Sequence, residues 1–221
     1  MICLVTDRRR LSTGVDAVDL LVELVGAAAR AGIDLVQVRE RDLEGRALAA
    51  LVSRCLAAVD RSATKVLVND RVDIAAATGA HGVHLRADSV NVTAARLLLG
   101  KHAMVGRSIH TVDEAASAAA DGADFLIFGA LYQTMSKDAG HPTVTLDDLR
   151  AAGRAATGVP ILAIGGITAT RASEVARAGA AGIAGIGIFV PPPGVTADRH
   201  LQSVAAQLRR SFARCEAVPL H

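Results

Sequence analysis

Eight strand-like segments alternate with eight helix-like segments along the 221 residues, which predicts an α/β fold closed as a (β/α)₈, or TIM, barrel. Eight such units in a chain of this length lie near the compact limit of that fold. No low-complexity linker or break in composition divides the chain, so residues 1–221 are expected to form one domain. A doubly wound open sheet is the alternative, although it normally needs fewer strands.

The predicted strands are short runs rich in Val, Ile and Leu that end at turn residues. They cover residues 2–6, 34–39, 65–69, 82–85, 103–107, 124–128, 160–164 and 182–187. Because a helix-like run separates each strand from the next, the strands are expected to pair in parallel through right-handed crossovers.

The predicted helices are Ala-, Leu- and Arg-rich runs with charges at helical spacing. They lie near residues 17–31, 44–60, 71–78, 92–99, 112–121, 146–157, 170–179 and 197–213. Gly32, Gly79, Gly122 and Gly179 follow four of these runs, where a residue able to adopt positive φ commonly ends a helix.

Composition narrows the function classes. A net charge of +2 and 2% aromatic residues give no electrostatic footprint or stacking platform for nucleic acid. No uninterrupted apolar stretch is long enough to span a membrane, and the apolar start of the chain is interpreted as a strand rather than a signal peptide. Three widely spaced cysteines, Cys3, Cys55 and Cys215, fit a reduced, cytoplasmic protein better than a secreted disulfide scaffold.

The second predicted strand carries polar side chains on one face. Gln37, Arg39 and Arg41 project to the same side at period two, while Leu35, Val36 and Val38 are apolar. A strand covered by helices should be apolar on both faces, and long polar side chains are costly to bury without a partner. This face is therefore expected either to line a cavity for a polar, anionic ligand or to be a solvated edge.

In a barrel of this kind the site forms at the carboxyl ends of the strands. Glycines after strands seven and eight, at 165–166 and 185–187, stand where barrels often bind phosphate through backbone N–H groups. Asp70 is a candidate Mg²⁺ ligand, and an N-cap of the following helix is its competing interpretation. His84 is expected to be a satisfied core histidine. His110 is a candidate general acid/base or, equally, a capping residue.

Nine segments, taken in order from residue 2 to about residue 189, resemble the thiamine phosphate synthase and TenI (thiazole tautomerase) family. They are Leu4–Asp7, Gln37–Arg41, Val68–Asp73, Gly82–Leu85, Ser108–Thr111, Gly122–Asp124, Thr134–Lys137, Ala163–Ile167 and Gly179–Gly182. The resemblance implies a TIM barrel in thiamin biosynthesis. The implied activity is the joining of hydroxymethylpyrimidine diphosphate to thiazole phosphate, with release of pyrophosphate.

The resemblance also implies roles for individual residues. The diphosphate would be held by Gln37, Arg39, Arg41, Asn69, Ser108 and Lys137. Thr134 and Ser136 would lie on the thiazole side, and the thiazole phosphate would be held by Gly166 and the backbone of residues 185–187, including Ile186 and Gly187. Mg²⁺ would be held by Asp70, with Asp88 as a second ligand. Arg39, Lys137 and His110 are the expected catalytic residues. The expected partners are small phosphorylated substrates, and a homodimer is possible.

Departures from the family pattern leave alternatives open. The second metal-binding aspartate of the synthases aligns with Ser89, Asp88 is displaced by one residue, and Arg86 adds a cation nearby. The tautomerase branch has a histidine where this chain has Ala130. A tautomerase using His110 or Tyr132, or a non-catalytic phosphate-ligand binder, are therefore the competing hypotheses to the synthase.

Overall fold

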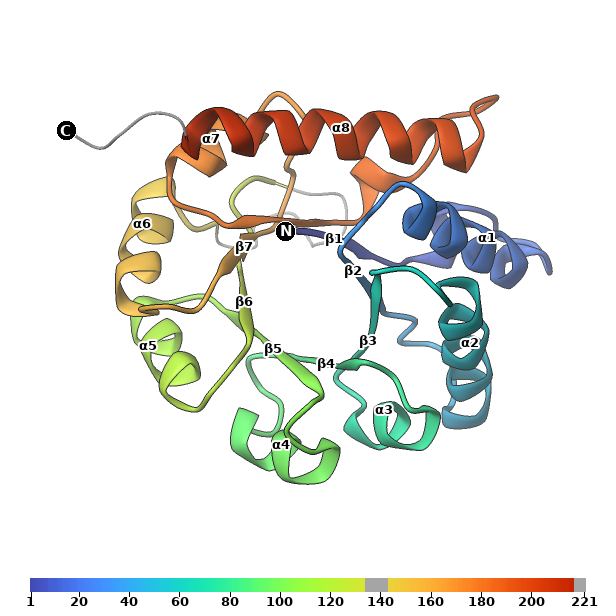
Figure 1. The fold of residues 1–221 in the computed structure, drawn as a ribbon, viewed down its shortest axis with the longest axis horizontal. Coiled ribbons are helices and arrows are strands. Elements are labelled where there is room, and N and C mark those ends of the chain that lie inside the picture. Colours follow the sequence, from blue (N-terminus) through green and yellow to red (C-terminus); the bar gives the residue numbers. More distant parts are fainter. Residues whose placement is uncertain (134–142, 217–221) are drawn as a thin grey trace.

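In a computed structural model, which describes residues 1–133 and 143–216 and the side chains up to residue 213, eight parallel strands close into a barrel (Figure 1). The strands are β1 (Ile2–Val5), β2 (Leu35–Val38), β3 (Lys65–Asn69), β4 (Gly82–Leu85), β5 (Met104–Ile109), β6 (Phe125–Phe128), β7 (Ile161–Ala163) and β8 (Gly182–Gly185). Each strand pairs with its neighbours in sequence, and β1 closes the ring by pairing with both β2 and β8. The predicted fold class is confirmed.

A helix follows each strand and packs outside the ring (Figure 1). The helices are α1 (Ala17–Arg30), α2 (Gly45–Ala58), α3 (Val72–Thr78), α4 (Val92–Leu99), α5 (Val112–Ala120), α6 (Leu146–Ala155), α7 (Ala172–Arg177) and α8 (Ala197–Glu216). The four glycines expected after helices, at 32, 79, 122 and 179, all have positive φ between 66° and 90°.

Two short 3₁₀ turns were not expected from the sequence. One, η1 (Arg8–Arg10), follows β1, and the other, η2 (Gly187–Phe189), follows β8. The predicted eighth strand, 182–187, is therefore too long: pairing stops at Gly185, and the chain turns at Gly187. A turn of three residues has no hydrophobic period by which a sequence pattern could reveal it.

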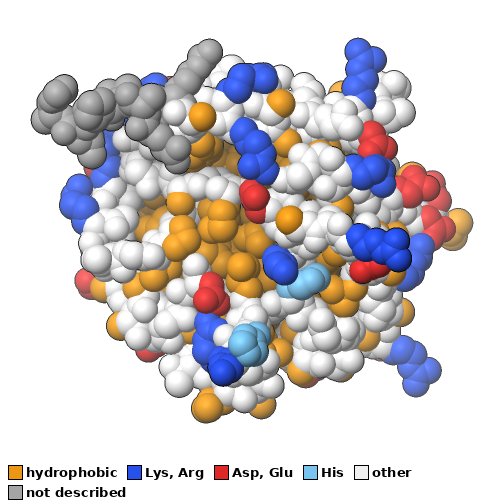
Figure 2. All heavy atoms as spheres, in the orientation of Figure 1, with side chains coloured by type: hydrophobic (Ala, Val, Ile, Leu, Met, Phe, Trp, Pro, Cys, Tyr) orange, Lys and Arg blue, Asp and Glu red, His pale blue; other side chains and the backbone are white. Residues whose placement is uncertain are grey.

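The core has two parts. A larger cluster fills the space between the strands and the helices. A smaller cluster fills the inside of the barrel and includes Cys3, Leu35, Leu67, Phe125 and Leu162. Figure 2 shows hydrophobic side chains gathered over the centre of the ring of strands. The barrel is thus a packed core rather than an open channel.

Two cysteines belong to this interior. Burial raises the pKa of both the Cys3 and the Cys55 thiols to about 12, which keeps them protonated and unreactive at neutral pH. Among the described residues no helix is long and apolar enough to cross a membrane.

Candidate active site

A cavity of about 670 Å³ opens at the carboxyl ends of the strands. Its floor is one ring of inward-facing side chains, a single residue from each strand or from the position just after it. The ring consists of Val5, Gln37, Asn69, His84, Ser108, Ile127, Ile164 and Ile186. The cavity has the size of a site for a small organic ligand.

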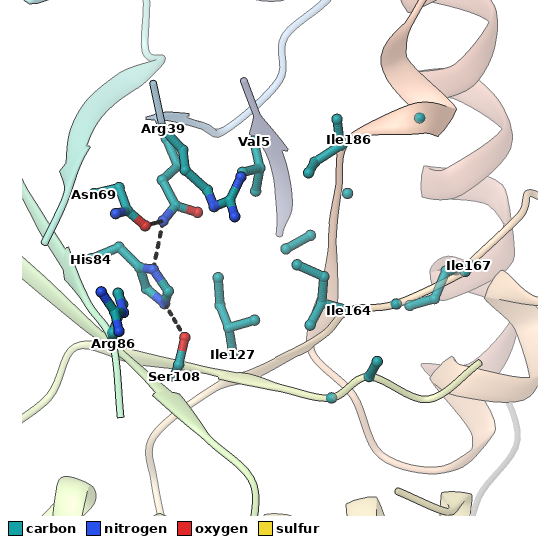
Figure 3. Close-up of a pocket in the computed structure, with 18 of the residues that line it drawn as sticks. Val5, Arg39, Asn69, His84, Arg86, Ser108, Ile127, Ile164, Ile167 and Ile186 are labelled. Carbon is teal, nitrogen blue, oxygen red and sulfur yellow. Dashed lines mark hydrogen bonds between the residues drawn. The ribbon is translucent and has the colours of Figure 1, made fainter. Parts of the chain in front are cut away.

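The order of the strands divides this floor into two halves. Strands β2 to β5 contribute the four polar side chains, and β6, β7, β8 and β1 contribute the four apolar ones. Figure 3 shows Asn69, His84 and Ser108 along one side and Ile127, Ile164 and Ile186 along the other. A ligand that fits both halves has a polar or charged end and an apolar end.

The polar half is a continuous hydrogen-bonded network (Figure 3). The Gln37 side-chain amide donates to Oδ1 of Asn69 at 2.9 Å and to Nδ1 of His84 at 2.7 Å. Since Nδ1 accepts, the proton of the neutral ring lies on Nε2, which faces the Ser108 hydroxyl oxygen at 3.4 Å. The Ser108 hydroxyl accepts there and keeps its own hydrogen to donate to a ligand.

His84 is buried and held neutral. Its ring stacks on Phe125 with 5.9 Å between centroids. Burial lowers its pKa to about 4, against an opposing effect of the Asp70 carboxylate. The satisfied, buried histidine expected from the sequence is what the structure contains, although its ring also forms part of the cavity floor.

Cationic side chains stand above the polar half. Arg39, Arg41 and Arg86 all line the cavity. Burial, and next the charge of Arg41, lowers the pKa of Arg39. The backbone N–H of Arg39 donates to Thr6 Oγ1, and the buried Glu40 carboxylate points away to Thr6 and Arg8, which fixes the direction of the arginines on either side of it.

The 3₁₀ turn after β1 brings a further arginine to the cavity. Arg10 of η1 also lines the cavity, and its Nη1 lies 3.5 Å from where a Cβ of Gly187 would stand. Arg10 is ion-paired with Asp7 at 3.2 Å. Its proximity to Gly187 depends on the closure of β1 against β8, and no local pattern in the run Arg8–Arg10 predicts it.

The two candidate metal ligands flank one arginine. Arg86 Nη2 lies 2.5 Å from Asp88 Oδ2, and Arg86 Nη1 lies 3.6 Å from Asp70 Oδ2. The interpretation of Asp70 as an N-cap is wrong, because Arg71 occupies that position and α3 has no side-chain capping bond. Asp70 instead adopts positive φ, +64°, between β3 and α3.

These carboxylates fit a divalent cation only together with ligand oxygens. The described residues contain no group of three or more His, Cys, Asp or Glu side chains arranged to hold a metal. Mg²⁺, however, is commonly bound by one or two carboxylates plus substrate phosphates. Asp70 and Asp88, which both pair with Arg86, are the two carboxylates that such a site would use.

His110 lines the cavity beside β6. Its Nδ1 donates to the Gly129 carbonyl at 2.8 Å, so its Nε2 carries the lone pair. Thr111, with Glu114, caps α5, so the capping interpretation of His110 is wrong. Tyr132 points elsewhere: its hydroxyl donates to Glu174 of α7 at 3.1 Å, and Arg171 covers its ring.

The glycines after β7 have a packing reason besides any phosphate. A Cβ on Gly165 would stand 2.5 Å from the Ala130 methyl, and one on Gly166 would stand 2.6 Å from the Gln133 carbonyl oxygen. Both glycines nevertheless line the cavity, as do Ile186 and Gly187. Thr134, Ser136 and Lys137 lie outside the described residues.

Sequence reasoning missed three of the four apolar residues of the floor; Ile186 is the one that it included. Val5, Ile127 and Ile164 lie at or one residue before the ends of predicted strands and are indistinguishable from core residues by hydrophobicity alone. The period-two argument applied to Gln37 would have found them if extended to every strand, because each stands two residues beyond an inward-facing core residue such as Cys3, Phe125 or Leu162.

A closed barrel with a half-polar, half-apolar cavity ringed by arginines at its strand ends defines a TIM-barrel enzyme for small anionic substrates. Residues 2–189 match the family model described as thiamine monophosphate synthase. The chain belongs to this family, which confirms the predicted family and its role in thiamin biosynthesis.

Individual relatives of the chain carry names that agree with this family. The chain is 38% identical to the thiamine-phosphate synthase of Roseiflexus castenholzii over 94% of this chain and 89% of that protein. It is 40% identical to the thiamine-phosphate synthase of Moorella thermoacetica over 85% and 90%. Among solved structures, thiamine phosphate pyrophosphorylase from Pyrococcus furiosus superposes with a TM-score of 0.78 at 25% identity, covering 97% of this chain and 96% of that one.

Proposed function

We propose that this chain is a thiamine-phosphate synthase. It would join hydroxymethylpyrimidine diphosphate to thiazole phosphate, breaking the bond from the pyrimidine methylene carbon to the diphosphate oxygen and forming a bond from that carbon to the thiazole nitrogen. The electron pair of the broken bond leaves with pyrophosphate. The observation that carries the proposal is the set of guanidinium groups above a polar half-floor, beside an apolar half-floor, in one cavity.

The cationic side chains of the cavity complement the negative charge that develops on the departing pyrophosphate. As the carbon–oxygen bond breaks, negative charge grows on the departing pyrophosphate, and fixed positive groups stabilise that state more than the ground state. Arg39 and Arg41 supply this charge, Ser108 supplies a hydroxyl donor, and Lys137 would add a further cation by family resemblance. The Gln37 and Asn69 side chains would orient the pyrimidine end.

The apolar half of the cavity floor suits the aromatic rings of the two substrates. Ile127, Ile164 and Ile186 offer hydrocarbon contact for a thiazole ring and exclude water from the cation formed on the pyrimidine. The thiazole phosphate would lie toward Gly166 and Gly187, with Arg10 nearby. Mg²⁺, held by Asp70 and Asp88, would supply additional positive charge for the diphosphate.

A second function has one observation in its favour. Tautomerases of the family carry a histidine at the position of Ala130, and here the His110 ring is bonded to the carbonyl of the preceding residue, Gly129. The free Nε2 of His110 is thus available as an acid/base beside that position. Tyr132, the other candidate, is occupied with Glu174.

The test is a coupling assay. The purified chain is given both substrates with and without Mg²⁺, and thiamin phosphate and pyrophosphate are quantified together. Equal amounts of both products establish the synthase. No product with intact substrates overturns it; isomerisation of thiazole phosphate carboxylate, abolished by His110→Ala, would then establish the tautomerase. Thermal stabilisation by the substrates without either reaction would indicate a binder.

A further inference from the structure

Arg86 lies between the two candidate metal carboxylates. Its guanidinium is 2.5 Å from Asp88 and 3.6 Å from Asp70, and its backbone N–H lies 3.5 Å from Asp70 Oδ1. The three side chains come from the turn after β4 and the end of β3, which are neighbouring strands. Arg86 therefore occupies the charge position that a divalent cation between these carboxylates would take.

Hydrogen bonds hold the backbone of the loop that carries Arg86. The N–H of Ser89 donates to the Arg86 carbonyl at 3.2 Å, which closes a turn and places Asp88 beside Arg86. Arg107 of β5 donates from one side to the Ala87 carbonyl at 2.8 Å and to the Val90 carbonyl at 2.5 Å. The backbone under Arg86 is thus fixed by a neighbouring strand, while its side chain is 42% exposed and able to turn.

Arg86 shares its cavity with two other guanidinium groups. Arg39 and Arg41 line the same cavity, and like charges converging on one space repel one another unless a polyanion lies between them. Figure 3 shows Arg86 beside Ser108 and His84, on the polar side of the cavity with Arg39. The structure thus provides a third cation for the same anionic group.

We propose that Arg86 is a diphosphate ligand, held in the unliganded protein by Asp70 and Asp88, and that divalent cations compete with it for these carboxylates. The proposal rests on the proposed function only in taking diphosphate as the ligand. It assigns a binding role to Arg86, a cation that stands beside Asp70 and Asp88 in this chain.

The exposure of the pairs makes the exchange feasible. Asp88 is 69% exposed, and an ion pair this exposed changes an equilibrium by about fivefold at most. A diphosphate offers several charged oxygens in bidentate geometry, which a guanidinium prefers to a single exposed carboxylate. When Arg86 turns to the diphosphate, Asp70 and Asp88 are released for the cation, so diphosphate and cation should bind cooperatively and reciprocally.

The experiment measures two probes on the full chain: inorganic pyrophosphate in metal-free buffer by calorimetry, and Mn²⁺ without pyrophosphate by electron paramagnetic resonance. Arg86→Gln should weaken pyrophosphate binding about tenfold or more, since a charged hydrogen-bonding partner is lost. The same change should tighten Mn²⁺ binding about fivefold, since the competing guanidinium is gone. Arg150→Gln, on the outer face of α6, is the matched control and should change neither.

Two further variants distinguish a binding role of Arg86 from a structural one. Asp88→Asn removes the competitor of pyrophosphate and should strengthen metal-free pyrophosphate binding two- to fivefold, which a merely structural role of Arg86 would not produce. Arg86→Lys, should the glutamine variant not fold, keeps the charge but loses the forked contact and should weaken pyrophosphate binding severalfold.

Weaker pyrophosphate binding together with tighter Mn²⁺ binding in Arg86→Gln supports the proposal. Pyrophosphate affinity within twofold of wild type, or Mn²⁺ binding no tighter than wild type, overturns it. Failure of the two proposals is distinguishable. A chain that makes thiamin phosphate without these shifts refutes only the role of Arg86, and a chain with these shifts that makes no thiamin phosphate refutes only the synthase.

Discussion

The side-chain amide of Gln37 donates a hydrogen bond to Nδ1 of His84 across 2.7 Å, at the bottom of the cavity. Because that nitrogen is the acceptor, His84 must be neutral, with its proton on the nitrogen that faces Ser108. Protonation of His84 would put a hydrogen on Nδ1, which would then face the N–H of the Gln37 amide, and neither of these buried donors would have an acceptor. The integrity of the cavity floor is therefore linked to pH.

The first prediction concerns stability against acid. The pKa of His84 is about 4 in the folded protein, below its ordinary 6.5, so the unfolded chain takes up a proton first as the pH falls. The stabilisation is complete above about pH 6.5 and is lost as the pH falls toward 4, by up to about 3 kcal/mol. Urea unfolding between pH 4 and 7 should show this slope in wild type and a shallower one in His84→Gln. Equal slopes in the two proteins would contradict it.

The second prediction concerns the support of the floor. A Cβ on Gly106 would stand 2.1 Å from the ring of Phe125, on which His84 stacks. Gly106→Ala should therefore cost about 1–3 kcal/mol of unfolding free energy through overpacking. Gly153→Ala is the matched control, since it lies in α6 with nothing within 4 Å of the new methyl and should stabilise by about 0.5–1 kcal/mol. Equal unfolding midpoints for the two variants would contradict the prediction, because they would show that the Phe125 ring moves aside without a loss of stability.

The third prediction concerns Asp70. Asp70→Asn keeps the shape of the side chain but removes its charge, so the Mg²⁺ concentration for half-maximal coupling should rise about tenfold. A titration of the coupling rate with Mg²⁺ measures this. Asp147→Asn, on the exposed side of α6, should behave as wild type. An unchanged Mg²⁺ requirement in Asp70→Asn would remove Asp70 from the metal site.

The fold was predictable because its signals are local. Each strand is a short apolar run ended by a turn residue, and each helix has its own period, so the sequence alone predicts all eight units. One error lies where the chain changes direction within a few residues, at Gly187, because a single turn of 3₁₀ helix has too few residues to show a period. The fifth strand, predicted to end at residue 107, continues to Ile109.

The site was predictable where a polar residue interrupts an apolar pattern and where glycines follow the last two strands. Gln37 and Arg39 break the pattern of a buried strand, and the structure places both at the cavity. Ile127 and Ile164 line the same cavity but read as core, because an apolar wall and an apolar core have the same composition. The contact of Arg86 with Asp70 joins two strands and depends on the register of the barrel.

The homodimer stays a prediction.

The most direct test of the central claim, that synthase chemistry occurs in this cavity, is the rate of thiamin phosphate formation by Arg39→Ala. Arg39 lines the cavity on the side of the polar floor, and losing a fixed charge that stabilises the departing pyrophosphate should lower turnover about 100-fold or more with the fold intact. Arg150→Ala, an exposed arginine of α6, should keep the wild-type rate. A wild-type rate in Arg39→Ala would place the reaction elsewhere and contradict the account.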